Sequence, residues 1–316
     1  MIGNRKCINL FFIVTFLLCL GSILTQHSER IDHITKVHKA QRRLLSDILL
    51  SGRCKYLYFD FGSNIGVQIR KVYEPDFYPE APIRPYFEKY FGSVKEGRKE
   101  GCSVGFEPNM AHTERLLSLQ DVYRKVGYPV VIFTDTAVDR YNGITKLVRD
   151  EADGAHKEWA DGVFNWRDYS SDELGKHSYS VLSIDLSEFI HSVYKEWNTI
   201  NFQNLTAMSH EGEVSHAKKG TIVAKFDIEG IELRLLPHLL AHGALCMIDY
   251  SYVEWHTFHM SKVVKSSWPG FPGLELETMI NWIMQETDHC NSVIQTMDDE
   301  AYNQDGFPFP TVPTRN

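Results

Sequence analysis

The chain of 316 residues carries 33 basic and 41 acidic side chains, a formal net charge of −8, and 43% of its residues are hydrophobic. This hydrophobic content is sufficient for a substantial core and argues against a chain that is disordered throughout. Because there is no basic excess, we expect no nucleic-acid partner.

The N-terminal sequence indicates a membrane anchor. Arg5 and Lys6 precede an apolar run at 8–24 that contains no charged side chain. This run is near the lower limit for a membrane-spanning helix and long for the apolar part of a cleaved signal peptide. We therefore expect a cytosolic tail at 1–7 and a transmembrane signal anchor at 8–24, since basic residues stay on the cytosolic side. The protein would then be a single-pass type II membrane protein of the Golgi or endoplasmic reticulum. Cleavage of the segment would make it secreted instead.

The next element is a predicted helix over Ser28–Leu50, within a stem at 25–51. Its apolar residues fall on one stripe, and basic residues occupy the opposite face. Ser28 is a suitable N-cap, and Gly52 follows the expected end. We expect this helix to pack on the domain that follows. A coiled coil between two chains is the alternative.

The lumenal domain at 52–316 alternates between short apolar runs and helical patterns. Strands are predicted at Tyr56–Phe61, Val104–Phe106, Pro129–Phe133, Thr221–Phe226 and Leu245–Val253, and helices at Ala111–Lys125 and Ile231–His242. This alternation predicts an α/β fold with a doubly wound, mainly parallel sheet. A proline-rich stretch before the second strand and a polar stretch at Trp197–Gly220 are expected to be surface insertions.

The first predicted strand ends in an acid and turns through two glycines into a helix. The segment Asp60-Phe61-Gly62-Ser63-Asn64-Ile65-Gly66 carries this pattern. The glycine spacing differs from that of dinucleotide-binding and P-loop motifs. Glycine lets a ligand approach the backbone, and ligands of parallel sheets bind at the carboxyl ends of strands. An acid here disfavours a diphosphate and favours a ligand with a positive centre and an amino group, such as S-adenosylmethionine. We assign Asp60, Gly62, Asn64 and Gly66 to its binding.

Acids after the second and third strands extend this predicted site. Glu107, at the end of strand two, can accept hydrogen bonds from the ribose hydroxyls. Asp135 follows strand three and can accept the exocyclic amine of an adenine, with the Ala137 backbone beside the ring. For Asp135 and Ala137, ordinary loop residues are an equally good interpretation.

Two further candidates follow strands four and five. Asp227 lies at the end of the strand that contains Lys225, and an acid there is costly unless it is partnered. His256 follows Val253-Glu254-Trp255 and can serve as a base. We assign Asp227 and His256 to catalysis, because methyl transfer to a hydroxyl needs a proton acceptor. From the sequence we assign no residue to a metal.

Three of these segments together resemble the FkbM family of methyltransferases. They are Asp60–Gly66, Phe106-Glu107-Pro108-Asn109 and Lys225-Phe226-Asp227-Ile228-Glu229-Gly230-Ile231-Glu232, in that order. Val181–Leu186 also looks like the strand and acid that precede the fourth core strand of that family. The resemblance covers about Tyr56–His256. It implies a class I methyltransferase, Rossmann-like fold, S-adenosylmethionine as the donor and an oxygen atom as the acceptor.

Four cysteines lie beyond the expected anchor. Cys54 and Cys102 each lie two residues before one of two neighbouring parallel strands, so a bond between them is geometrically possible. Cys246 and Cys290 then form the second pair, and four free thiols are the alternative. Paired cysteines suit an oxidising compartment. The sequon at Asn204 fits the same address.

The leading hypothesis is an S-adenosylmethionine-dependent O-methyltransferase that acts on a glycan or glycoprotein in the secretory pathway. A type II Golgi glycosyltransferase is one alternative, in which Asp227-Ile228-Glu229 would be a metal-binding motif. The other is a methyltransferase-like protein that binds without catalysis, because fold alone does not fix function.

Overall fold

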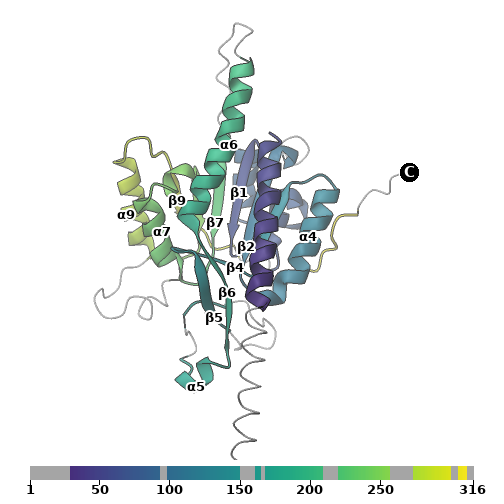
Figure 1. The fold of residues 1–316 in the computed structure, drawn as a ribbon. Helices are drawn as coiled ribbons and strands as arrows, with labels where there is room; N and C mark the ends of the chain where they lie inside the picture. Colours follow the sequence, from purple (N-terminus) through teal and green to yellow (C-terminus); the bar gives the residue numbers. More distant parts are fainter. Residues whose placement is uncertain are drawn as a thin grey trace, which may run out of the picture.

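The computed structural model describes residues 29–92, 98–149, 161–164, 168–208, 220–256, 273–299 and 305–311. Within these residues, six strands form one parallel sheet in the order β3-β2-β1-β7-β8-β9 (Figure 1). Their bounds are β1 Tyr56–Phe61, β2 Gly101–Glu107, β3 Val130–Thr134, β7 Ile222–Phe226, β8 Tyr250–Val253 and β9 Val293–Thr296. The expected doubly wound, parallel α/β sheet is confirmed. Its strand order reverses between β1 and β7, which is where such sheets bind ligands.

Helices cover both faces of this sheet. One face packs against the helix at 29–50, α6, α7 and α9, and the other against α2, α3 and α4. The bounds are α2 Val67–Tyr73, α3 Arg84–Phe91, α4 Thr113–Lys125, α6 Leu186–Met208, α7 Glu232–Ala241 and α9 Gly273–Gln285. Apolar side chains that alternate along β1 divide between the two cores, with Phe59 on the α6 face and Tyr58 on the α2 face.

A second, three-stranded sheet has the order β4-β6-β5. Its strands are β4 Thr136–Asp139, β5 Gly143–Val148 and β6 Ser178–Asp185. β4 and β6 are parallel, whereas β5 and β6 are antiparallel. A single residue, Asp135, separates β3 from β4, so this small sheet begins directly at the carboxyl end of the main one. The short helix α5, Ser171–Leu174, precedes β6.

Two expectations for individual elements were wrong. Leu245–Val253 is not one strand: a 3-10 turn at Leu245–Met247 precedes the shorter β8. The polar stretch that begins at Trp197 is not a loop as far as Met208, because α6 continues to that residue. The proline-rich insertion contains a 3-10 turn at Pro75–Phe77 and helix α3, and both have a proline in their first turn, where proline costs no hydrogen bond.

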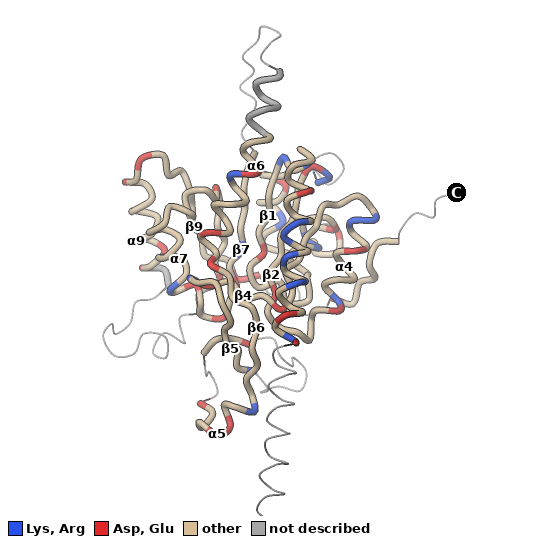
Figure 2. Tube along the Cα trace, viewed as in Figure 1, with Lys and Arg blue, Asp and Glu red and all other residues tan. Residues whose placement is uncertain are grey.

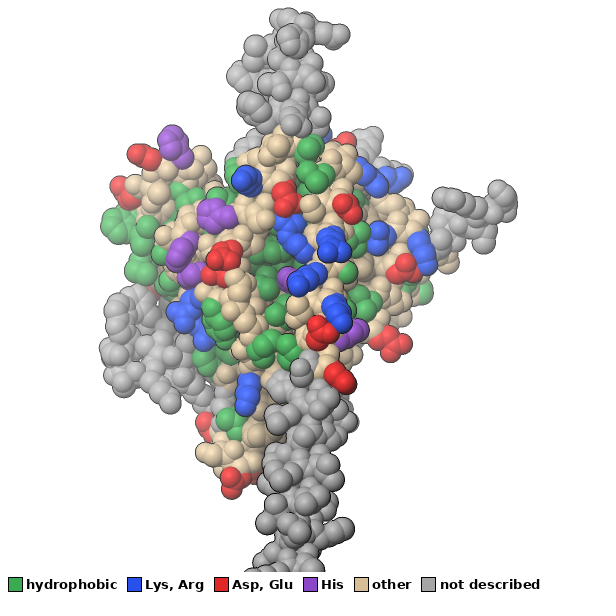
Figure 3. Space-filling view, in the orientation of Figure 1, with side chains coloured by type: hydrophobic (Ala, Val, Ile, Leu, Met, Phe, Trp, Pro, Cys, Tyr) green, Lys and Arg blue, Asp and Glu red, His purple; other side chains and the backbone are tan. Residues whose placement is uncertain are grey.

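The helix at 29–50 packs on the domain. Its Leu45 and Leu49 side chains are buried in the core on the α6 face, and Arg42 forms an ion pair with Glu196 of α6. Lysine and arginine lie on its outer surface, as Figures 2 and 3 show. In the part of the chain that the structure describes, no helix is long and apolar enough to cross a membrane. The expected tail and anchor at 1–24 lie outside the described residues.

Both expected disulfides are present. Cys54 is bonded to Cys102 with their Cα atoms 5.4 Å apart, and Cys246 to Cys290 with a Cα separation of 4.8 Å. Cys102 is the second residue of β2, and Cys246 lies in the 3-10 turn before β8. These bonds suit an oxidising, secretory-type environment.

Buried charges anchor the described C-terminal segment. The Asp305 carboxylate accepts from Arg70 Nη1 of α2 at 2.9 Å and from the Tyr78 hydroxyl at 2.9 Å. Lys71 of the same helix forms a buried ion pair with Asp299, with a distance of 2.7 Å between Nζ and Oδ1. These contacts hold the segment against α2 and Tyr78.

Candidate functional site at the carboxyl ends of the strands

The turn after β1 requires glycine at both expected positions. Gly62 has φ +89°, and a Cβ atom there would lie 1.8 Å from the Asp227 carbonyl oxygen. Gly66 has φ +88°, and its Cβ atom would lie 3.1 Å from Leu116 and Leu119 of α4. Both glycines therefore let the turn pack against neighbouring elements, rather than leaving room for a ligand at these two atoms.

Asn64 and Glu107 join the ends of β1 and β2. Asn64 lies in the left-handed region with φ 48°, and its backbone N–H donates to Glu107 Oε2 at 2.6 Å. The Asn109 N–H donates to Glu107 Oε1 at 2.7 Å. The carboxylate is 5% exposed, and burial raises its pKa to about 8 against the effect of these two donors. A carboxylate has about four lone-pair positions, so Glu107 retains acceptor capacity toward a ligand.

Asp60 is fully buried at the end of β1, opposite Lys225 of β7. Among the described residues, neither of its carboxylate oxygens has a hydrogen-bond partner. Burial raises the pKa of Asp60 to about 7, while the Lys225 ammonium acts in the opposite direction. A buried acid without a hydrogen-bond donor is costly, and a cationic or amino group of a ligand would offset that cost.

The structure places Asp135 and Ala137 differently from each other. Asp135 has φ 52° and lies half-buried between β3 and β4, where it accepts from the Thr113 hydroxyl at 3.1 Å. Ala137 lies in β4 and not in a loop, and it is buried and paired with Ser183 of β6. It packs with the partly buried Met110, just beyond Glu107, so it lies near the β2 end.

Asp161 is a further acid near Glu107 that the sequence did not indicate. It is 8% exposed and accepts from the Tyr179 hydroxyl at 2.8 Å. Its charge contributes to the raised pKa of Glu107. Asp161 belongs to a stretch without periodicity or a motif, and the bridge between Val148 and Gly162 and the hydrogen bond from Tyr179 bring it to the site. No local sequence signal identifies it.

A second group of charges lies at the ends of β7 and β8, on the other side of β1. The buried Lys225 ammonium is 2.9 Å from Asp227 Oδ2 and 3.4 Å from Glu254 Oε2. Burial alone would raise the pKa of Asp227, but Lys225 and His256 lower it. Burial and the Asp227 charge raise the pKa of Glu254 to about 7. Asp227 is therefore held as an anion, whereas Glu254 exchanges a proton near neutral pH.

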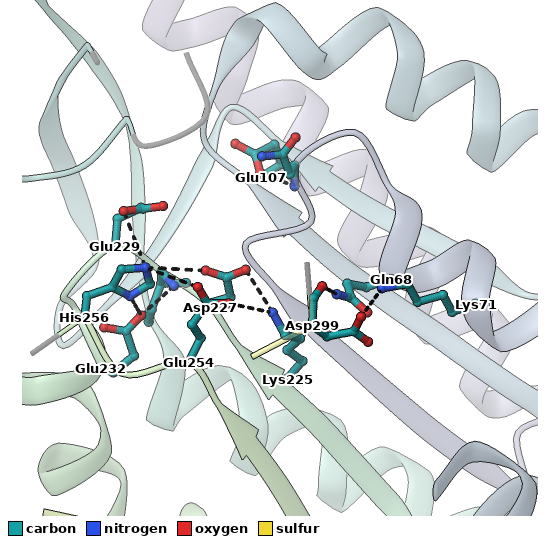
Figure 4. Close-up of polar contacts among 12 residues, drawn as sticks. Gln68, Lys71, Glu107, Lys225, Asp227, Glu229, Glu232, Glu254, His256 and Asp299 are labelled. Carbon is teal, nitrogen blue, oxygen red and sulfur yellow. Dashed lines mark hydrogen bonds and ion pairs between the residues drawn. The ribbon is translucent and has the colours of Figure 1, made fainter. Parts of the chain in front are cut away.

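His256 is surrounded by carboxylates (Figure 4). Its Nδ1 atom is 3.1 Å from Glu232 Oε1, and its Nε2 atom is 3.6 Å from Glu229 Oε2 and 3.8 Å from Asp227 Oδ1. Burial alone would lower the pKa of His256, but the carboxylates outweigh it and raise the pKa to about 10. The expected role of His256 as a base does not fit this environment, because a protonated imidazole cannot accept a proton.

The sequence-predicted residues thus form two groups on either side of the β1 turn. Asp60 and the Asn64–Glu107 contact make the first, and the residues around Asp227 and His256 make the second. The donor atoms of Asp227, Glu229 and His256 all lie within 4.8 Å of one another, an arrangement that can hold a metal ion. Comparisons of the chain with protein-family models, curated proteins and solved structures found no match. The resemblance to the FkbM family therefore rests on the motifs alone and stays a prediction.

Proposed function

We propose that the protein is an S-adenosylmethionine-dependent O-methyltransferase of the FkbM type. One observation carries this proposal: the Asn64 N–H donates to Glu107 at 2.6 Å, which joins the β1 turn to the acid after β2. Buried Asp60 lies at the base of the same turn. Two acids at the carboxyl ends of adjacent parallel strands suit a donor that combines a cationic centre, an amino group and a ribose.

In this proposal, each group of the donor meets a defined side chain. Asp60 accepts from the donor's amino group, and the remaining lone pairs of Glu107 accept from the ribose hydroxyls. Asp135 and the β4 backbone near Ala137 flank the adenine. The contact of Glu107 with two backbone amides pre-organises the carboxylate, so little conformational entropy is lost when the ribose binds.

Methyl transfer would occur beside the second group of charges. A hydroxyl oxygen of the acceptor forms a bond to the methyl carbon while the carbon–sulfur bond breaks, and the hydroxyl proton passes to a base. Glu254 suits this role better than His256, because its pKa is raised to about 7 whereas that of His256 is raised to about 10. Asp227, paired with Lys225, would orient the acceptor through its carboxylate.

The disulfides support the acceptor class. Two disulfide bonds indicate an oxidising compartment, where glycans and glycoproteins are the abundant hydroxyl-bearing substrates. We therefore propose a glycan or glycoprotein acceptor in the secretory pathway.

Donor affinity in two nearly isosteric variants tests the proposal. At a pH above the raised pKa values of Asp60 and Glu107, about 7 and about 8, both acids are ionised. There Asp60→Asn and Glu107→Gln should each weaken S-adenosylmethionine binding by about tenfold or more, because a hydrogen bond to a charged group contributes ~1.5–3 kcal/mol. Asp121→Asn is the matched control, since Asp121 is an exposed acid on α4 that pairs with Lys125. Isothermal titration calorimetry measures all three variants. Unchanged affinity in both site variants would remove the donor assignment.

The base assignment has its own test. Glu254→Gln should lower turnover by about a hundredfold or more, because a general base contributes that much, and should leave donor affinity nearly unchanged. The wild-type rate should rise with pH through about 7 as Glu254 loses its proton, and this rise should be absent from the variant. Release of S-adenosylhomocysteine with a glycoprotein acceptor measures both. A variant with the wild-type rate and pH profile would exclude Glu254 as the base.

One observation favours a second candidate, a metal-dependent glycosyltransferase. Asp227 and Glu229 are separated by one residue and lie together with His256 in a possible metal-binding group. The acids Asp60 and Glu107 oppose this candidate, because they would repel the diphosphate of a nucleotide sugar.

A further inference from the structure

The donor atoms around His256 are spaced closely enough for one ion to bind several of them. The Nε2 atom of His256 is 3.6 Å from Glu229 Oε2 and 3.8 Å from Asp227 Oδ1. These are ion-pair distances, longer than the ~2.7–3.2 Å of a direct N–H···O hydrogen bond. Neighbouring ligands bonded at ~2.1 Å to one tetrahedral ion lie about 3.4 Å apart. The two separations exceed that spacing by about 0.2 and 0.4 Å, and all three donor atoms lie within 4.8 Å of one another.

The imidazole is already oriented for coordination. Its Nδ1 atom faces Glu232 Oε1 at 3.1 Å, and the backbone N–H of Ile228 donates to the same oxygen at 2.6 Å. Glu232 is fully buried in the first turn of α7, so its carboxylate cannot turn away to solvent. A carboxylate that accepts from one ring nitrogen while the other faces acidic ligands is the usual arrangement behind a metal-bound histidine.

Lys225 fixes Asp227 in a similar way. Its ammonium group lies 2.9 Å from Asp227 Oδ2, on the opposite oxygen from the one that faces His256. Oδ1 is thereby directed toward the imidazole, as Figure 4 shows. In His256 and in Asp227, a neighbour therefore holds one side-chain atom, Nδ1 or Oδ2. The other atom, Nε2 or Oδ1, faces the other candidate ligand.

The charge of the group favours a dication. Four carboxylates, those of Asp227, Glu229, Glu232 and Glu254, surround Lys225 and His256. An imidazole binds a metal ion only after it loses its proton. With the carboxylates ionised and His256 neutral, the described side chains of this group have three negative charges in excess, and one divalent cation reduces that excess to one. This excess lies where the chain is mostly buried, so solvent screens it poorly.

From this geometry we infer that Asp227, Glu229 and His256 form a binding site for one divalent cation of the first transition row. The imidazole selects against Mg²⁺ and Ca²⁺, which prefer ligand sets composed of oxygen, and favours Mn²⁺ or Zn²⁺. Three protein ligands leave coordination positions for water or for a hydroxyl oxygen of an acceptor. The inference does not depend on the proposed methyltransferase function, because it rests on the geometry of these three residues and uses neither Asp60 nor Glu107.

Manganese titration of the full chain tests this inference. After treatment with EDTA and removal of the chelator, Mn²⁺ is added, and the free ion is measured by electron paramagnetic resonance. We expect saturation at one equivalent, with Zn²⁺ displacing Mn²⁺ and Mg²⁺ failing to compete at equal concentration. Pulsed spectroscopy of the bound Mn²⁺ should show coupling to one imidazole nitrogen. Saturation without nitrogen coupling, or no saturable binding, would overturn the site.

Variants separate the ligands from surface groups. Glu229→Gln should weaken Mn²⁺ binding by about tenfold or more, and His256→Ala should also abolish the nitrogen coupling. Glu232→Gln should weaken binding but keep the coupling, because Glu232 positions the imidazole without touching the ion. The controls Glu275→Gln and His191→Gln change an exposed acid on α9 and an exposed histidine on α6, and both should bind Mn²⁺ like the wild type. Equal affinity in Glu229→Gln and in these controls would overturn the assignment.

S-adenosylmethionine affinity, measured on the same variants, keeps the two proposals distinct. Glu229→Gln and the wild type should bind the donor equally in the absence of metal. A wild-type chain that binds the donor but shows no saturable Mn²⁺ binding removes the cation site alone. Donor failure with one Mn²⁺ bound through an imidazole removes the methyltransferase proposal alone.

Discussion

Asp60 and Glu107 bind a proton more tightly than an acid in water, and the reason is the same for both. Asp60 is fully buried and Glu107 is 5% exposed, so the anionic form of each loses its hydration. Two backbone amides compensate Glu107 in part, whereas the Asp60 oxygens have no hydrogen-bond partner among the described residues. Burial of these two carboxylates lowers the stability of the folded chain, and a ligand with a cationic group or hydroxyls would offset that loss when it binds.

This proton affinity predicts a pH dependence of folding. Burial raises the pKa of Glu107 from the ordinary value of 4.5 to about 8. Between these values the folded chain binds more protons than the unfolded chain, so the free energy of unfolding should fall as pH rises from 5 to 8. Glu107→Gln removes this contribution and should reduce the fall. Urea denaturation at pH 5, 6, 7 and 8 measures it.

Glu275→Gln, which changes an exposed acid on α9, is the control for this experiment. It should keep the wild-type slope of unfolding free energy against pH. The same slope in Glu107→Gln would contradict the burial assigned to Glu107.

The sequence predicted the places of the main acids but not their environments. Asp60, Glu107 and Asp227 lie at strand ends, as their motifs indicated. The raised pKa of His256 depends on Glu232, which lies 24 residues earlier in the chain, and on Glu229 and Asp227, whose charges together outweigh the lowering effect of burial. A motif reports which residue types are present, whereas a pKa depends on the three-dimensional neighbours that the fold brings together.

At the scale of the elements, the turn between β1 and α2 depends on close contact with the end of β7. The Phe61 carbonyl accepts from the Asp227 N–H at 3.0 Å, and Gly62 faces the Asp227 carbonyl oxygen. The turn therefore links the proposed donor residues to the second group of charges. A change of turn geometry would affect both groups together.

Two glycine variants separate the effect of this contact from the effect of backbone angle. Gly62 and Gly127 both have positive φ, +89° and +97°, but a Cβ atom at Gly127 would meet no described atom within 4 Å. Gly127→Ala should cost about 1–2 kcal/mol, the strain of an L-residue in the left-handed region. Gly62→Ala should cost clearly more, because it adds a clash with backbone. Chemical denaturation of both variants measures the difference, and equal losses would show that the contact is not close.

The boundary errors also have a physical explanation. The outer part of α6 is polar and resembled a loop, but Trp197 is buried, and its indole N–H donates to the Cys54 carbonyl at 2.5 Å. That contact joins residues 143 positions apart, so no window of the sequence contains it. The apolar run before β8 forms a 3-10 turn. Its Met247 N–H donates to the Ala244 carbonyl three residues earlier, and not to a neighbouring strand.

At the scale of the whole molecule, parallel topology made the main sheet and both disulfides predictable. Once β1 and β2 are neighbours, Cys54 and Cys102 must lie at the same edge of the sheet, opposite the site. The second sheet was not predicted, because its antiparallel β5–β6 pair encloses a long insertion that has no hydrophobic period. That sheet carries Ala137 and, through the bridge at Gly162, Asp161 to the site.

Ligand selectivity tests the central claim most directly. The full chain is titrated in a calorimeter with S-adenosylmethionine, with S-adenosylhomocysteine and with uridine diphosphate sugars, the last in the presence of Mn²⁺. Because Asp60 and Glu107 suit a cationic donor with an amino group and a ribose, we expect saturable one-to-one binding of the first two ligands and none of the nucleotide sugars. Binding of a nucleotide sugar without binding of S-adenosylmethionine would contradict the account and favour a glycosyltransferase.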